Sequence, residues 1–164
     1  MNPVEAIRSK VVPQLDRAGW VGPLLMRLSL GAVFITSGWG KLHNLGQVTG
    51  FFTQLGIPFP GFTATLTSST ELVGGVLILL GLFTRVAAVP LILNMVVAIL
   101  TARRPEIDGV LTLLGFIEFT YLAGFAWLLV AGAGLVSLDA LLFRREGGVP
   151  HPLVRPKTHA AGHR

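Results

Sequence analysis

Long apolar stretches alternate with short polar segments along the chain. Four of these stretches are long enough to cross a bilayer, since about 20 helical residues at a rise of 1.5 Å span a hydrocarbon core of ~30 Å. They run over about residues 21–42, 64–83, 86–102 and 110–130. The spans of a β-barrel would alternate apolar and polar residues, whereas residues 73–80 are apolar or glycine throughout. The pattern therefore predicts four transmembrane α-helices.

The segments around these spans complete the predicted architecture. Short loops between the spans favour an all-α fold, a transmembrane four-helix up-down bundle that forms one membrane domain over residues 21–143. Before it, apolar residues from Val4 to Leu15 recur at helical spacing among basic residues, which predicts an interfacial amphipathic helix within residues 1–20. After it, residues 144–164 are basic and contain several prolines, which predicts a disordered cytoplasmic tail.

Composition supports a membrane location. Hydrophobic residues make up 52% of the 164 residues and charged residues only 13%, about half the charge of a soluble domain, so the expected surrounding is a lipid bilayer. The net charge of +5 does not indicate nucleic acid, because basic flanks at the cytoplasmic ends of spans produce the same excess. Nine lysines and arginines flank the side that holds both termini, and three flank the other. We therefore expect a multi-pass plasma-membrane protein with both termini in the cytoplasm.

Several cofactors are excluded by residue types that are missing. The chain has no cysteine, so it can hold no disulfide and no iron–sulfur cluster. No predicted span contains a histidine, which excludes haem held between two intramembrane histidines. No group of residues has the spacing of a metal site. We expect neither haem, nor an iron–sulfur cluster, nor a metal in this chain.

An amphipathic segment follows the first predicted span. Residues 45–55 place leucine, valine and phenylalanine on one helical face. Gly56-Ile57-Pro58 then turns the chain back toward the membrane. Two interpretations are open: a small hydrophobic lid on the outer face of the bundle, or an interfacial anchor.

Three charged residues lie inside predicted spans, where each costs about 2.5–3.5 kcal/mol: Arg27, Glu71 and Glu118. Depths counted at 1.5 Å per residue place both glutamates in the outer half of the membrane and Arg27 in the inner half. We therefore predict an outer cluster of Lys41, Glu71 and Glu118. Arg27 is expected to form a structural ion pair with Asp139, just past the fourth span. Tilted helices would instead merge Arg27 with both glutamates.

A set of short motifs resembles the DoxX family of small four-span membrane proteins. No single motif is specific, but their order and spacing over residues 22–142 match the family. The motifs are Arg27-Leu28 with Leu30-Gly31, Gly38, Lys41-Leu42, Gly56-Ile57-Pro58, Glu71-Leu72-x-Gly74-Gly75, Gly81-Leu82-x-Thr84-Arg85 and Ser137-Leu138-Asp139. One departure is Gly132-Ala133-Gly134, where the family usually has Gly-Pro-Gly.

The resemblance implies a setting in oxidative metabolism, since the family name resembles that of a membrane subunit of a thiosulfate:quinone oxidoreductase. It implies partners among membrane or membrane-associated redox proteins and leaves catalysis by this chain open. We therefore expect a membrane-anchoring, partner-binding subunit of an oxidoreductase assembly that is linked to quinone. Two alternatives stay open: a non-catalytic accessory subunit that stabilises a larger membrane complex, and a small proton or solute transporter.

The outer charged residues are the candidate functional residues. Glu71 and Glu118 are the catalytic candidates, because like charges that share a low-dielectric site favour a neutral carboxylic acid. Such an acid can donate a hydrogen bond to a quinone carbonyl or pass a proton. Lys41 and His43 join the two glutamates as candidates for cofactor binding. The structural interpretation is that the ion pairs fix helix register and that His43 is a solvated loop residue.

Overall fold

The computed structural model describes residues 12–13 and 18–143, and within them every regular element is helical. The elements are α2 (Val21–His43), α3 (Leu45–Gln54), α4 (Pro60–Leu80), α5 (Thr84–Thr101), the 3-10 helix η1 (Arg104–Glu106), α6 (Val110–Gly115), α7 (Ile117–Ala131) and α8 (Leu138–Phe143). The amphipathic helix predicted within residues 1–20 and the tail predicted over residues 144–164 rest on residues outside those described.

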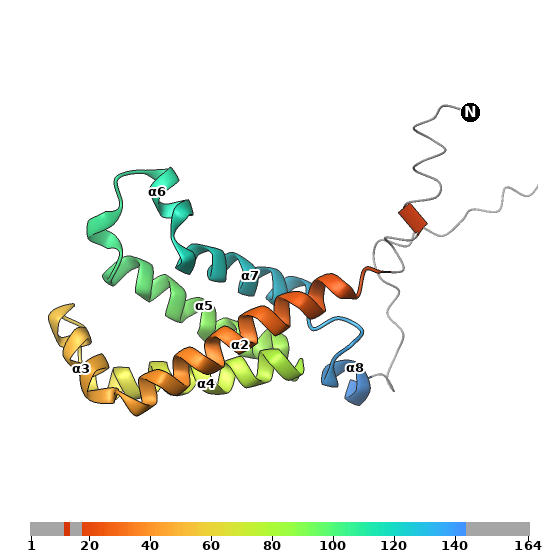
Figure 1. Cartoon of the computed structure of the whole chain (residues 1–164), viewed down its shortest axis with the longest axis horizontal. Helices are drawn as coiled ribbons and strands as arrows, with labels where there is room; N and C mark the ends of the chain where they lie inside the picture. The colour runs from red at the N-terminus through yellow and green to blue at the C-terminus, as the bar shows by residue number, and fades with distance from the viewer. Residues whose placement is uncertain (1–11, 14–17, 144–164) are drawn as a thin grey trace, which may run out of the picture.

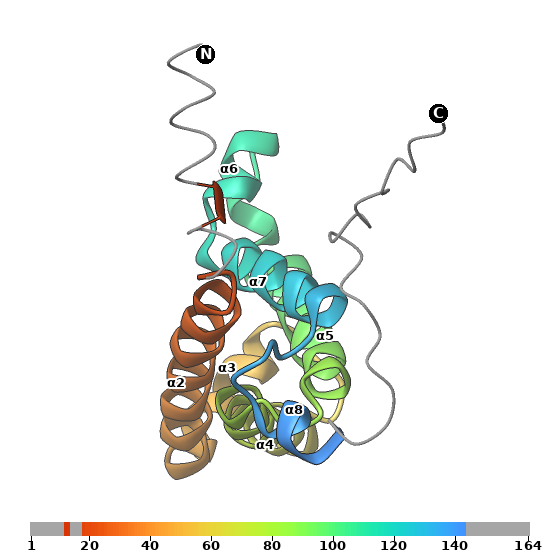
Figure 2. The ribbon, with the colours of Figure 1, turned by 90° about the vertical axis from the view of Figure 1, so that its right-hand side faces the viewer.

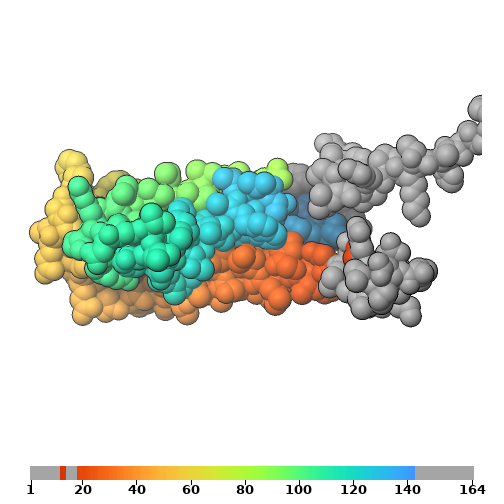
Figure 3. Space-filling model, turned by 90° about the horizontal axis from the view of Figure 1, so that it is seen from above, coloured from red at the N-terminus to blue at the C-terminus, as the bar shows by residue number. Residues whose placement is uncertain are grey.

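The four longer helices run back and forth along one axis (Figure 1). Helices α3 and α6 lie at one end of this bundle, the α3 end. The turn from α4 to α5 and the short helix α8 lie at the other, the α8 end. Viewed from the α8 end, α2, α4, α5 and α7 surround a common centre (Figure 2). From above, the molecule is elongated, and α3 and α6 both lie at the same end of it (Figure 3).

The helices have the length and surface of membrane spans. Helices α2, α4 and α5 are long and apolar enough to cross a bilayer, and α7 is a shorter apolar helix. The predicted all-α membrane bundle is therefore confirmed. Large apolar side chains are exposed on its outer surface, where lipid would surround them; examples are Leu25, Val73, Leu93, Leu100 and Val130.

The fourth apolar stretch differs from the single helix predicted over residues 110–130. It is divided into α6 and α7 at Phe116, whose backbone is extended with φ −71° and ψ 139°. Three local features favour a new helix start here. Gly115 is a weak helix former; the Phe116 carbonyl accepts hydrogen bonds from the first turn of α7; and Glu118 lies in that turn, where a negative charge suits the helix dipole.

The core lies between α2, α4, α5 and α7. Its largest buried side chains come from all four helices: Phe34, Ile78, Leu91, Phe125 and Leu128. The rings of Phe34 and Phe125 meet edge to face with centroids 4.8 Å apart, a favoured aromatic geometry. These contacts hold the two helix pairs α2–α4 and α5–α7 together.

Glycines let α2 and α4 approach closely. A Cβ added at Gly75 would lie 2.8 Å from the backbone nitrogen of Ile35, and one added at Gly38 would overlap the backbone of Leu72. Small residues at such contacts allow packing between backbones, which is a main source of helix association in membranes.

Two glycines of α2 provide a matched test of this packing. We expect Gly38→Ala to lower the free energy of unfolding by about 1–3 kcal/mol, because its methyl group would overlap α4. Gly40→Ala should raise it by up to about 1 kcal/mol through helix propensity, since nothing lies within 4 Å of a Cβ there. Unfolding in mixed micelles, followed by circular dichroism, measures both. Equal effects of the two substitutions would contradict the close approach.

Candidate functional site

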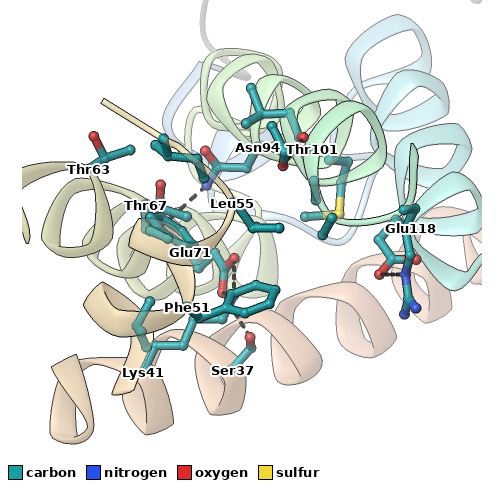
Figure 4. A pocket seen from close by; sticks show the side chains of 18 of the residues that line it. Ser37, Lys41, Phe51, Leu55, Thr63, Thr67, Glu71, Asn94, Thr101 and Glu118 are labelled. Carbon is teal, nitrogen blue, oxygen red and sulfur yellow. Dashed lines mark hydrogen bonds and ion pairs between the residues drawn. The ribbon is translucent and has the colours of Figure 1, made fainter. Parts of the chain in front are cut away.

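A cavity of about 860 Å³ lies at the α3 end of the bundle. Its walls come from α2, α4, α5 and α7, and α3 covers it. The apolar side chains that α3 contributes to the lining are Val48, Phe51 and Phe52, and Leu55 follows directly after the helix. These are residues of the amphipathic face seen in the sequence, so α3 has the position of a hydrophobic lid. Figure 4 shows how α3 side chains and the charged groups converge on this space.

Lys41 and Glu71 form an ion pair on the wall made by α2 and α4. The Lys41 ammonium lies 2.5 Å from Glu71 Oε1 and 2.7 Å from Oε2, and the Ser37 hydroxyl donates to Oε2 at 2.8 Å. Ser37 and Lys41 are four residues apart, so they share one face of α2. The side chain of Glu71 is only 3% exposed, against 37% for Lys41. The predicted contact between Lys41 and Glu71 is present, and Ser37 completes it.

Glu118 lies on the other wall and pairs with a residue that the sequence did not suggest. Its Oε1 accepts a hydrogen bond from Arg103 Nε at 3.0 Å, and Arg103 also binds the exposed Glu106. Within the described residues Glu118 therefore joins Arg103 in place of the predicted cluster with Lys41. The hydrogen bonds that Arg103 donates to Glu118 and Glu106 raise the pKa of Arg103, so the guanidinium stays positively charged.

The path of the chain explains this exchange of partners. Arg103 lies two residues after the end of α5 and Glu118 lies in the first turn of α7, and these two helices pack side by side. The guanidinium also lies 5.5 Å from the centroid of the Phe116 ring, a distance at which a cation is attracted to the ring face. The one signal in the sequence was the pair Arg103-Arg104 on the side with few basic residues.

His43 stands apart from the cavity. Its ring contacts that of Trp39 in a tilted arrangement with centroids 4.3 Å apart, and Nδ1 lies 2.9 Å from the Trp39 carbonyl oxygen. The side chain is exposed at the end of α2, and the described cavity lining does not include it. The geometry does not bring His43 together with the other candidates.

Arg27 lies at the α8 end, where the predicted ion pair with Asp139 is replaced by other contacts. Its guanidinium is buried and donates to backbone carbonyl oxygens: Ile78, Leu79, Ala133 and Val136. The last turn of a helix leaves carbonyl groups without intrahelical partners, and a guanidinium carries five donors. Backbone carbonyls, rather than a carboxylate, accept the hydrogen bonds of the Arg27 guanidinium.

Asp139 is used elsewhere, at the start of α5. Its Oδ1 accepts a hydrogen bond from Phe83 N at 2.8 Å and its Oδ2 one from Thr84 N at 3.2 Å. A carboxylate at this position satisfies free N–H groups and interacts favourably with the helix dipole. Among the described residues the ion pairs do not include one between Arg27 and Asp139, although the two charges still attract each other over a longer distance.

The cavity has the chemistry of a site for an apolar ligand with polar groups at its edge. Its lining is mostly aliphatic and aromatic, and polar groups enter from separate walls, namely the Lys41–Glu71 pair and the Arg103–Glu118 pair. Small-molecule sites are commonly apolar clefts of this size with a few placed polar groups. Within the described part of the chain no three histidine, aspartate or glutamate residues are grouped to hold a metal ion.

Comparisons with known proteins give a family match and three relatives. A model of the DoxX family matches residues 22–104. "Uncharacterized membrane protein Rv3486" of Mycobacterium tuberculosis is 38% identical over 133 residues, which cover 74% of this chain and 82% of the relative. "Putative oxidoreductase CatD" of Bacillus subtilis is 31% identical over 132 residues, or 79% of this chain and 93% of the relative. "Inner membrane protein YqjF" of Escherichia coli is 32% identical over 128 residues, or 76% and 95%. No solved structure shows a significant match.

The Lys41–Glu71 pair can be tested by a double-mutant cycle. We expect Lys41→Met to lower the free energy of unfolding by about 2 kcal/mol or more, because it leaves the buried Glu71 without its cation. Adding Glu71→Gln should restore most of that loss, since no buried charge then remains. Unfolding in mixed micelles measures each variant. Strictly additive effects of the two substitutions would show that the pair is not coupled.

Proposed function

The chain belongs to the DoxX family of membrane proteins, and we propose that it serves as a membrane subunit of an oxidoreductase assembly and holds a quinone in the cavity beneath α3. The observation that carries this proposal is the cavity itself, a mostly apolar space of about 860 Å³ with an ion pair on each of two walls. One relative also has the word oxidoreductase in its name.

The lining fits a quinone in its apolar surface and in its hydrogen-bonding groups. Phe34, Phe52 and Met95 offer apolar contacts for a ring and its tail. A lysine ammonium has three N–H donors and a guanidinium has five, so Lys41 and Arg103 keep donors for a carbonyl oxygen beyond those bound to the glutamates. When bound, a quinone would supply the exchange of electrons and protons, which these side chains do not supply.

The chain's own residues would then bind, orient and shield the ligand. The apolar face of α3 lies over the cavity and reduces its contact with water, and electrostatic interactions are stronger where water is excluded. Glu71, held by Lys41 and Ser37, fixes the α2–α4 wall, and the Arg103–Glu118 pair fixes the α5–α7 wall. The ion pairs thereby define two polar positions around an apolar space.

The same proposal places the cavity on the outer side of the plasma membrane. The α8 end is joined to both chain termini, whose flanks hold most of the lysines and arginines. Such residues favour the cytoplasmic side, so the α3 end would face outward. Partner redox proteins could then meet the subunit at either end of the bundle while its outer helices anchor the assembly.

Two substitutions on α5 test whether the cavity binds a quinone. Ala98 lines the cavity, whereas Leu93 is 58% exposed on the outer surface. We expect Ala98→Trp to weaken binding of a short-chain benzoquinone at least about tenfold, a loss of about 1.4 kcal/mol, because the indole occupies ligand space. Leu93→Trp should leave it within about twofold, a change of less than about 0.5 kcal/mol. Calorimetric titration of the full chain in lipid nanodiscs measures both; equal affinities would contradict the proposal.

Association with redox enzymes calls for a separate test. We expect the chain, tagged and isolated from its host in mild detergent, to co-elute with an oxidoreductase that reduces added benzoquinone. That activity should fall when the chain carries Ala98→Trp and persist when it carries Leu93→Trp, because only the first substitution fills the cavity. Quinone reduction that is identical with both variants would assign the quinone site to another subunit and favour an accessory role.

A further inference from the structure

The two carboxylates of the cavity differ in their hydrogen bonding. Both oxygens of Glu71 are occupied, because Lys41 donates to each and Ser37 donates to Oε2. Glu118 accepts one hydrogen bond at Oε1, from Arg103, and its Oε2 is buried with no partner among the described residues. Glu118 therefore retains one acceptor atom that the surrounding protein does not satisfy.

Two hydroxyl groups of the cavity lining are already engaged by the backbone. The hydroxyl of Thr63 donates to the Pro58 carbonyl at 2.8 Å, and that of Thr101 donates to the Val97 carbonyl at 2.7 Å. An acceptor that is buried without a donor is costly, and more so on a charged group. A donor brought in by a ligand would remove this cost.

Glu118 is placed so that a ligand can reach it. It lines the cavity and its side chain is 18% exposed. Figure 4 shows the carboxyl group on the opposite side of the drawn pocket from Lys41. The terminal torsion of a glutamate has a broad energy well, so rotation of the carboxyl group can present Oε2 to a ligand in the cavity.

We propose that the cavity binds the reduced, hydroquinone form of its ligand more tightly than the quinone, with one ligand hydroxyl donating to Glu118. The inference rests on the proposed function and adds the redox form that the site selects. A hydroquinone carries hydroxyl donors, whereas a quinone presents only carbonyl acceptors to a carboxylate that also accepts. Glu71 does not discriminate in this way, because its oxygens already have donors.

Selection of the reduced form has a functional consequence. A ligand state that binds more tightly is stabilised by mass action. The bound quinone is therefore easier to reduce than the free quinone, since reduction leads to the better-bound state. A site of this kind suits the acceptance of electrons from a partner donor.

The preference can be measured directly as a ratio of affinities. The full chain in lipid nanodiscs is titrated without oxygen, by calorimetry, with tetramethyl-p-benzoquinone and with its hydroquinone. We expect the hydroquinone to bind at least about tenfold more tightly, as one hydrogen bond to a charged group allows. In Glu118→Gln the side-chain amide can donate to a carbonyl, so the ratio should fall to about one or below.

A matched control separates this effect from the loss of any negative charge at this end of the bundle. Asp108→Asn makes the same change from acid to amide at an exposed position outside the described cavity lining, and should leave the ratio unchanged. Equal affinities of the unaltered protein for the two forms would overturn the inference and leave the proposed function standing. An unchanged ratio in Glu118→Gln would do the same. Binding of neither form would contradict the proposed function as well.

Discussion

The buried guanidinium of Arg27 is the contact on which the α8 end depends. A charge inside a span is costly, and here backbone carbonyls meet that cost by taking the place of a counter-ion. The carbonyls come from the last turn of α4 and from the segment after α7, so one side chain of α2 joins three parts of the chain. Gly81, with φ +67°, gives this contact room, since a Cβ there would lie 2.5 Å from the Arg27 Cζ.

The bundle is therefore packed differently at its two ends. Toward the α8 end, Arg27 and the Asp139 cap hold the helices and their turns together. Toward the α3 end the helices enclose a cavity, and ion pairs hold each wall separately. Close packing at one end thus supports an open space at the other, which is a general way to hold a ligand site on rigid elements.

The helices could be predicted from the sequence one segment at a time, but the partners with which the charged side chains interact could not. Long apolar runs were sufficient for α2, α4 and α5, and the periodicity of residues 45–55 was sufficient for α3. The partners of Arg27 are carbonyl oxygens, which every residue has, so no residue type marks them. Depth in the membrane alone predicted that Glu118 would lie near Lys41. In the structure, the break at Phe116 and the path of the chain from α5 to α7 place Arg103 beside Glu118 instead. Both differences arise where irregular backbone decides which side chains meet.

The shortness of α7 has a consequence for the surrounding lipid. Its 15 residues extend about 22 Å at 1.5 Å per residue, less than the ~30 Å of a typical hydrocarbon core. Such hydrophobic mismatch is relieved when the bilayer thins beside the short helix. Lipid headgroups would then lie deeper beside α7 than around the three longer helices. The bilayer around this protein would therefore be of uneven thickness, with its thinnest part beside α7.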